Sequence, residues 1–595
     1  MLDLPSAEER RRLKAHGTFK ASVYKKTDAV LFVESEPDQA AQIAELSGKP
    51  VLSLPEQRIV YGPRGPRPVA QPSAARKIAR RLKQRLVQLA SETLLPAPTT
   101  DLRKRTLTGT ALVGSSQAVK VVVQLLSVVI LGRLLAPSDV GVFAMILPFS
   151  TFVGLFQDLG LTQALTTAKS LTTGQASTMF WLNLLMSAAL GAILALGAPL
   201  IAGFYGEPRL QTLTIAVAST FILSGLMTVQ FALLNRTMQF GKIAAIDIMS
   251  SVGGLICAVC VAVFYPSPWA FVAALVGGQL ISLVAAWLMS NWKPIGPGRF
   301  EEIKRLLHFG AGVTGFNITN FFARSMDNVL IGRFAGPVQL GFYDRAYKLM
   351  VLPLQQVNRP IGRVLIPALS RLVDEPHRYR HAYTRVVQQT LLLIVPAVIA
   401  LVFTADAVIY ALLGPQWGEA APIFAWLAIA ALHQPLTTTI GWLFISQGRT
   451  STFARWGLFN AVVCVSAFAI GLPRGAVGVA QAYALADTLI LLPAVWYLVG
   501  RKGPVRTKDL VNIARPFIVA GCAAALAVFA ASHILSGLRA TLDGWPFLLA
   551  CFAVSYSVFL IAMLALRSGR EALQETSSIA KSVYRGVLGR IQKKA

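Results

Sequence analysis

Charged side chains are scarce in this sequence. They make up 14% of its 595 residues, whereas a soluble protein of this size usually carries about 25%. Several stretches of about 20 residues therefore contain almost no charge, and a helix of that length crosses the ~30 Å hydrocarbon core of a membrane. The mean hydropathy is +0.57. These features argue against an ordinary soluble domain and predict a multi-pass membrane protein.

Cysteine and histidine are also rare, with five and six residues. The cysteines lie in apolar runs, and Cys257 and Cys260 are spaced like metal ligands but have no histidine or acidic residue nearby. His308 and His433 stand alone. Without a ligand cluster or a nucleophile–base pair, we expect no metal, no cofactor, no catalytic residue and no enzymatic activity.

Fourteen apolar segments follow one another along the chain. They lie near residues 107–131, 141–165, 179–203, 211–233, 247–265, 269–290, 308–331, 341–367, 386–412, 420–445, 456–472, 475–499, 516–536 and 546–566. The fold class that we predict is an all-α integral membrane protein with about 14 transmembrane helices.

The loops between these segments carry the basic residues unequally. If the N-terminus is cytoplasmic, the inner loops hold 18 Lys and Arg residues and the outer loops hold five. This asymmetry follows the positive-inside rule and predicts that both termini are cytoplasmic. It also accounts for much of the net charge of +28 without nucleic-acid binding.

The polar N-terminal region differs from the rest. Residues 29–34 and 51–54 are predicted strands and 37–46 a predicted helix, so residues 1–72 form a small cytoplasmic α/β region with a linker. Residues 73–94 have the pattern of a basic amphipathic helix, which suits an anionic membrane surface or ordinary packing equally well. The predicted domains are 1–72, this helix and its linker at 73–106, transmembrane repeats at 107–290 and 308–499, a terminal helix pair at 516–566, and a basic cytoplasmic tail at 567–595.

The two repeats share a motif. Ile130–Phe143 reads ILGRLLAPSDVGVF and Leu330–Tyr343 reads LIGRFAGPVQLGFY, so a Gly, an Arg, a Pro and a second Gly match at an offset of 200. Helices 1–6 and 7–12 are therefore predicted to be two copies of one six-helix unit, followed by the C-terminal pair. Because six is even, both copies share one orientation, and a binding site is expected between them.

These segments resemble Wzx-type polysaccharide flippases. The resemblance is carried by the ILGRLLAPSDVGVFA stretch, by DLGLTQAL at 158–165, by FWLNLL at 180–185, and by RSMDNVLIGR at 324–333 followed by GFY at 341–343. It covers roughly residues 107–500 and is closest to the lipopolysaccharide, exopolysaccharide and capsule branch of the polysaccharide transporter family. That family belongs to the multidrug/oligosaccharidyl-lipid/polysaccharide exporter superfamily.

The resemblance implies a function. The protein would translocate undecaprenyl-diphosphate-linked oligosaccharide units from the cytoplasmic to the periplasmic leaflet of the bacterial inner membrane, by alternating access. Its expected partners are that substrate and membrane lipids, with a polysaccharide polymerase and other assembly proteins as further candidates and no nucleic acid.

Charged residues inside the predicted helices point to the same class of substrate. A charge in the bilayer costs at least ~2.5–3.5 kcal/mol, so it must face a cavity or a partner. On a helical projection the polar residues of the eighth segment share one face, and those of the first and seventh segments form similar stripes. The predicted cationic cavity consists of Lys120, Arg324, Arg345, Lys348, Arg359 and Arg363. Its predicted polar lining consists of Gln117, Gln124, Asn317, Asn320 and Gln356.

Guanidinium and ammonium groups bind a diphosphate, and amides bind sugar hydroxyls. Arg345 and Arg363 could instead extend to the two membrane surfaces. Asp327 is a candidate switch that pairs with Arg324, or half of a static ion pair. Asp158, Asp247 and Asp487 are candidates for ion coupling, with capping of a helix end as the alternative for each. Two alternative functions stay open, namely an ion-coupled drug or small-molecule exporter of the same superfamily and a membrane-embedded polysaccharide-assembly enzyme or scaffold.

Overall fold

The structure is a computed structural model. It describes residues 32–34, 37–49, 51–53, 58–60, 102–157, 171–296, 311–535 and 544–578, together with positions 21, 22, 25, 162, 165 and 166. The chain divides into two compact units, residues 1–88 and 89–595. The predicted amphipathic helix at 73–94 and the end of the basic tail, residues 579–595, lie outside the described residues.

The first unit contains a small three-stranded sheet. Strands β1 (Phe32–Glu34) and β2 (Val51–Ser53) pair in parallel, and β3 (Arg58–Val60) pairs antiparallel to β2. Helix α3 (Pro37–Ser47) connects β1 to β2 and buries Ala40, Ile43 and Ala44. The strands and the helix that the sequence predicts here are present, so the all-α description applies only to the second unit.

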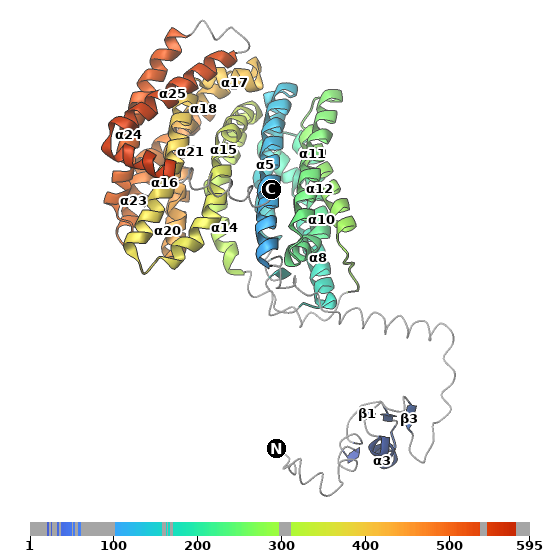
Figure 1. The fold of residues 1–595 in the computed structure, drawn as a ribbon. Helices are drawn as coiled ribbons and strands as arrows, with labels where there is room; N and C mark the ends of the chain where they lie inside the picture. The colour runs from blue at the N-terminus through green and yellow to red at the C-terminus, as the bar shows by residue number, and fades with distance from the viewer. Residues whose placement is uncertain are drawn as a thin grey trace, which may run out of the picture. The chain divides into compact units, whose positions relative to one another are not determined.

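The second unit is helical in its described parts (Figure 1). Its first half contains α5 (Leu102–Leu134), α6 (Pro137–Gly154), α8 (Thr173–Leu196), α9 (Ala198–Tyr205), α10 (Arg209–Arg236), α11 (Phe240–Phe264) and α12 (Trp269–Met289).

The second half begins with α14 (Ala311–Phe334) and α15 (Gly336–Arg371). It continues with α16 (Pro376–Phe403), α17 (Ala405–Leu413), η3 (Pro415–Trp417), α18 (Ala420–Ala431), α19 (Gln434–Thr438), α20 (Ile440–Ser446), α21 (Thr450–Gly471), η4 (Leu472–Arg474), α22 (Gly475–Ala486), the π-helix η5 (Asp487–Leu491) and α23 (Leu492–Gly500). Helices α24 (Thr507–Ile534) and α25 (Trp545–Ala565) then pack on each other and on α16.

In the described part of the chain, ten helices are long and apolar enough to cross a membrane, or eleven if the bent pair α18 and α19–α20 is one span. The predicted count of fourteen is larger for two reasons. First, α14 and α15 carry too many polar side chains to count as apolar spans. Second, the run Thr450–Gly500 is counted as one span although it folds back on itself at η4. The chain is thus a multi-pass membrane protein, and the count of fourteen stays a prediction.

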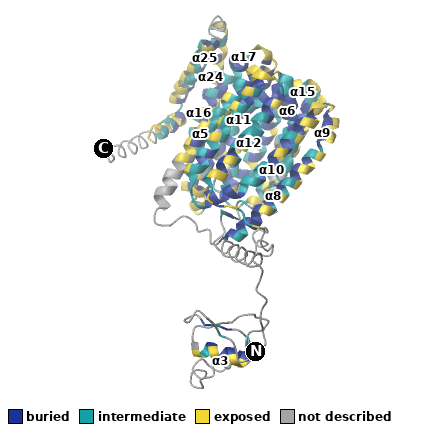
Figure 2. Cartoon of the chain, turned by 90° about the vertical axis from the view of Figure 1, so that its right-hand side faces the viewer, coloured by how far each residue is buried: buried dark blue, intermediate teal, exposed yellow. Residues whose placement is uncertain are grey.

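Large apolar side chains cover the outside of this unit. Leu196, Phe264, Leu288 and Ile534 are each about four-fifths exposed, and exposed positions recur along many of the helices (Figure 2). In water this surface would drive aggregation, whereas in a bilayer it contacts lipid chains. Buried positions lie between neighbouring helices and form one large core with two smaller clusters.

The two halves meet where α6 packs against α15. A Cβ atom on Gly141 would overlap the backbone carbonyl of Pro337, and a Cβ atom on Gly341 would overlap that of Pro137. The helices therefore approach so closely that only glycine fits at either position. These are the residues that match in the two sequence motifs, and their contacts are reciprocal.

Candidate functional site

Buried polar residues cluster on α14 and α15 beside this helix crossing. Asp327 is 5% exposed, and its Oδ2 accepts a hydrogen bond of 2.9 Å from the Tyr343 hydroxyl. Its Oδ1 accepts a second bond of 2.8 Å from the backbone N–H of Asn328. Asp327 is thus anchored by its own helix and by α15, which fixes the relative position of the two helices.

A second buried carboxylate lies one residue after Tyr343. Asp344 is 4% exposed and forms an ion pair of 2.9 Å with Lys348, one helical turn further along α15. Lys348 is therefore not a free cation. The sequence reasoning missed Asp344, although the i, i+4 spacing of an acid and a lysine was a visible sign of pairing.

Arg345 is the most enclosed cation of the site. Its side chain is 2% exposed, and its guanidinium lies 5.0 Å from the ring centre of Phe271 on α12. Phe271 in turn stacks on Phe143 of α6, so Arg345 of the second half is packed against an aromatic wall from the first half. Among the described residues, its Nε and Nη2 atoms have no hydrogen-bond partner.

Arg345 lies well inside helix α15. Because α15 begins at Gly336 and not near residue 341, Arg345 lies nine residues inside the helix, or about 14 Å along its axis. A buried guanidinium with unused donors in such a place is well suited to bind an anionic ligand.

Lys120 has a partner within the first half. Its Nζ lies 3.0 Å from Asp247 of α11, and both side chains are about one-third exposed. Asp247 lies seven residues inside α11, so it does not cap the helix end. Lys120, which was predicted to line the cavity, is therefore neutralised by Asp247, which was predicted as a candidate for ion coupling.

The other predicted site residues fall into two groups. Gln117 is partly buried and Gln124 is exposed, both on α5. Asp158 and the side chains of six residues on α14 and α15 lie outside what the structure describes. These six are Asn317, Asn320, Arg324, Gln356, Arg359 and Arg363. The predicted ion pair between Arg324 and Asp327 therefore stays a prediction.

Matching contacts between the halves join the ends of α5 and α14. A Cβ atom on Gly132 would lie 2.6 Å from Leu413 on α17, and one on Gly332 would lie 2.9 Å from Tyr205 on α9. Arg133 donates to the backbone carbonyl of Leu412 at 3.2 Å. By the predicted topology this is the outer side of the membrane, so the halves are closed against each other there.

The polar side chain of Trp417 strengthens this closure. Its indole N–H donates to the carbonyl of Gly132 at 2.7 Å. At the equivalent place in the other half, the Arg333 guanidinium lies 5.8 Å from the ring centre of Phe204. The sequence identified Arg133 and Arg333 as repeat markers, whereas the structure shows that each contacts the opposite half.

An apolar pocket of about 420 Å³ lies on the same interface. Its walls come from α6, α9 and α14 and include Phe149, Phe152, Phe204, Phe321 and Met326. Almost no polar surface lines it, so its chemistry suits a hydrocarbon group. The interface between the halves thus combines a buried cation with an apolar recess.

A buried acid and histidine lie at two irregular points of the second half. His433 is at the break between α18 and α19, where the chain bends by 48°. Its Nε2 lies 3.8 Å from Asp487, the first residue of the π-helix, and 3.0 Å from the Thr488 hydroxyl. Asp487 is a helix-interior residue, so it too does not cap a helix end.

Comparisons with known proteins agree with this architecture. Residues 130–422 match a family described as polysaccharide biosynthesis protein. The chain is 25% identical to the teichuronic acid biosynthesis protein TuaB of Bacillus subtilis (strain 168), over 67% of this chain and 83% of TuaB. It is 26% identical to the succinoglycan biosynthesis transport protein ExoT of Rhizobium meliloti (strain 1021), over 68% and 83%. It is 23% identical to the lipopolysaccharide biosynthesis protein WzxC of Escherichia coli (strain K12), over 65% and 80%.

Solved transporter structures share the fold. The lipid II flippase MurJ in an inward closed conformation superposes with a TM-score of 0.61 at 14% identity, covering 76% of this chain and 98% of MurJ. An inward-facing multidrug resistance transporter of the MATE family gives 0.54 at 14% identity, covering 66% and 95%. Together these matches agree with the resemblance seen in the sequence: the chain is similar to polysaccharide biosynthesis and transport proteins, and it shares the fold of MurJ.

Proposed function

We propose that this transporter moves an undecaprenyl-diphosphate-linked oligosaccharide from the cytoplasmic to the periplasmic leaflet of a bacterial inner membrane. The observation that carries the proposal is the buried Arg345, whose unused donors lie where the two halves meet. A diphosphate supplies acceptors that match a guanidinium. The apolar pocket beside α14 offers a surface for the polyprenyl chain.

The proposed architecture has fourteen spans. Helices α14 and α15 are long enough to cross the bilayer, and the 51-residue run Thr450–Gly500 is about 77 Å long as one helix, far beyond a single crossing. Counting α14, α15, the bent pair and a second span within that run raises ten spans to fourteen. With basic loops inside, both termini are cytoplasmic.

The proposed mechanism is alternating access between two six-helix units. The reciprocal contacts of Gly141 and Gly341, and of Gly132 and Gly332, support a pseudo-twofold relation between the halves. The outer ends are in contact, so the conformation is closed toward the periplasm under the proposed topology. Binding of the diphosphate at Arg345 would favour separation of these ends. Arg324, Arg359 and Arg363 stay in the proposal as further cations of the path.

The test is export by Arg345 variants in a strain that lacks the gene. Replacing a buried charge with an apolar side chain of similar volume often preserves stability, so Arg345→Met should insert at the normal level. Loss of one charge-assisted bond costs about 1.5–3 kcal/mol, which lowers transport about 10- to 100-fold. Arg345→Lys keeps the charge without the bidentate geometry and should retain partial export.

The matched control is Arg371→Met, which removes an exposed arginine from the end of the same helix. It should leave export unchanged. Membrane abundance is measured by blot for every variant. Full export by an abundant Arg345→Met protein would show that Arg345 does not hold the substrate.

A further inference from the structure

The helix pair α11–α12 of the first half and the helix pair α21–α22 of the second half differ in where their backbones approach each other. In the first half, Gly254 of α11 and Gly278 of α12 lie so close that a Cβ atom on Gly254 would be 2.7 Å from the Ala274 carbonyl. In the second half, α21 and α22 make a similar approach only near η4, where Gly471 and Gly478 meet. The π-helix η5 then interrupts the α-helical path between α22 and α23.

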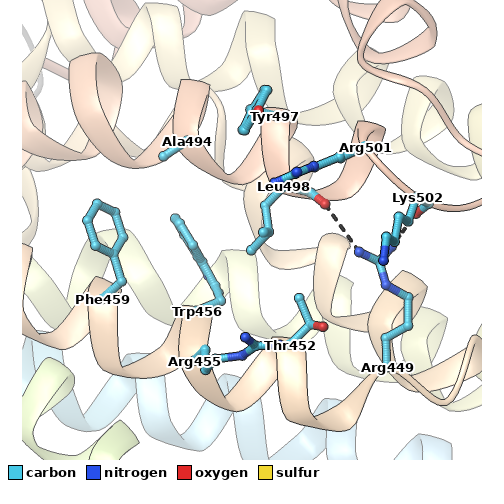
Figure 3. Close-up of a pocket in the computed structure, with 10 residues that line it drawn as sticks. All are labelled: Arg449, Thr452, Arg455, Trp456, Phe459, Ala494, Tyr497, Leu498, Arg501 and Lys502. Atoms are coloured by element: carbon cyan, nitrogen blue, oxygen red, sulfur yellow. Dashed lines mark hydrogen bonds between the residues drawn. The ribbon is translucent and has the colours of Figure 1, made fainter.

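A pocket of about 550 Å³ opens between α21 and α23 (Figure 3). Arg455 and Trp456 come from α21, Tyr497 comes from α23, and Arg501 directly follows the end of α23. Lys502 and Arg449 complete the basic part of the lining. None of the ten described residues that line this pocket is acidic.

Arg449 has a structural task in this pocket. Its Nη2 donates to the Leu498 carbonyl at 3.2 Å, its Nη1 donates to the Lys502 carbonyl, and its guanidinium lies 5.1 Å from the ring centre of Phe444. It thereby ties the start of α21 to the end of α23 at the basic end of the pocket.

The remaining three cations are available to a ligand. Arg455, Arg501 and Lys502 are exposed, and within the described part of the chain none of them forms an ion pair or a side-chain hydrogen bond. Three like charges around one pocket repel each other, and an anion that binds there removes the repulsion. Guanidinium groups in particular suit the oxygens of a phosphate.

The surroundings point to a lipid as the carrier of that phosphate. Phe459 and Ala494 line the pocket beyond the basic residues, and Leu458 and Val462 of α21 are about 60% exposed. Hydrocarbon chains could lie along this apolar surface while the headgroup occupies the basic end. Trp and Tyr side chains are typical of the level where headgroups lie, and basic pockets between helices on the cytoplasmic side bind anionic headgroups.

We propose that the pocket between α21 and α23 binds the phosphate headgroup of an anionic lipid in the cytoplasmic leaflet. This inference rests on the proposed orientation of the chain and not on transport through the Arg345 site. The same phosphate chemistry is present in an acidic phospholipid and in the diphosphate of the lipid-linked substrate. The two sources are separated by the choice of probe.

The experiment measures lipid binding to the purified full-length protein by native mass spectrometry from neutral detergent. The probes are phosphatidylglycerol, phosphatidylcholine and undecaprenyl diphosphate. The test variant is Arg455→Gln/Arg501→Gln, in which both changed side chains are exposed, so folding should persist. The matched control, Lys508→Gln/Arg515→Gln, removes two exposed charges near the pocket that do not line it.

For phosphatidylglycerol, we expect the test variant to raise the dissociation constant about thirtyfold, from the contribution of two basic residues. The control and Arg345→Met should bind as the unmodified protein does. Stronger binding of phosphatidylglycerol than of phosphatidylcholine identifies a phospholipid site, and loss of undecaprenyl diphosphate binding alone identifies a substrate-entry site. Equal affinity of the test and control variants for both anionic probes overturns the proposal. Export is measured in a separate experiment. The lipid-binding result can therefore be interpreted even if Arg345 proves not to hold the substrate.

Discussion

Helices α6 and α15 occupy matching places in the two halves but carry opposite chemistry. At the offset of 200 residues, four polar positions of α15 correspond to apolar positions of α6. The polar residues are Tyr343, Asp344, Arg345 and Lys348, and their counterparts are Phe143, Ala144, Met145 and Pro148. The glycine contact is kept on both sides.

This difference teaches how the two halves divide their tasks. The shared glycines allow the close approach, which requires the same shape from both helices. The ionisable groups are concentrated on α15, and the first half supplies the aromatic wall of Phe143 and Phe271 against which Arg345 packs. A duplicated scaffold can therefore carry a one-sided binding site.

The largest effect should come from the feature that the halves share. Gly341→Ala places a methyl group on the Pro137 carbonyl, and relief of such a clash requires the two halves to separate. We expect a loss of more than about 3 kcal/mol in the free energy of unfolding. The measurement is denaturation of the purified protein in detergent.

The control for this glycine is Gly154→Ala, because a Cβ atom at Gly154 has no atom within 4 Å among the described residues. It should denature as the unmodified protein does. Gly141→Ala should match Gly341→Ala, since the contact is reciprocal. Similar stability of the Gly341 and Gly154 variants would refute the close crossing.

The next effect separates the two lysine–aspartate pairs. Lys348→Met leaves Asp344 unpaired at 4% exposure, whereas Lys120→Met leaves Asp247 unpaired at about one-third exposure. Breaking a buried pair costs about 3–5 kcal/mol, and an exposed pair contributes at most about 1 kcal/mol. Lys348→Met should therefore lower the free energy of unfolding more than Lys120→Met does, as measured by denaturation in detergent.

A double variant checks the cause of this ranking. Lys348→Met/Asp344→Asn removes the buried charge together with its partner, so it should recover most of the lost stability. If the two single variants are equally stable, the charges of the second half are not buried as the structure shows.

A smaller effect is expected at the hydroxyl that distinguishes Tyr343 from Phe143. Tyr343→Phe removes the bond to Asp327 and leaves a buried carboxylate oxygen without that donor, at a cost of about 1–3 kcal/mol. Tyr265→Phe, at an exposed tyrosine, serves as the control. Thermal unfolding of both variants makes the comparison, and equal melting temperatures would contradict a role for this bond in joining α14 to α15.

Much of this fold could be predicted from the sequence. Apolar length located the helices. The matched glycines were predicted only as markers of a repeat, and the structure shows that Gly141 and Gly341 lie at the helix crossing. Helix ends were less accurate, because apolar composition does not mark caps: α6 ends at Gly154 and not near residue 165, and α15 begins at Gly336. Arg345 therefore lies nine residues inside α15, whereas it lies four residues inside the predicted segment 341–367.

The site was harder to predict than the fold. Helical periodicity grouped the cations on one face, but it could not show that Phe271 from another helix covers Arg345, or that Asp247 neutralises Lys120. These contacts depend on tertiary packing. The break at His433 had a signal in Pro435, which stands at the start of α19 and cannot continue the preceding helix. The π-helix at Asp487 had none, since its apolar pattern suits a regular helix equally well.

The central claim is that substrate held at Arg345 opens the outer contact between the halves. Spin labels at Leu200 on α9 and Tyr410 on α17, both exposed, would report this opening by double electron–electron resonance in lipid nanodiscs. The native cysteines are first replaced. Undecaprenyl-diphosphate-linked oligosaccharide should shift the distance distribution toward longer values in the otherwise unmodified protein and leave it unchanged in Arg345→Met. An unchanged distribution in a labelled protein that still exports substrate would contradict the account.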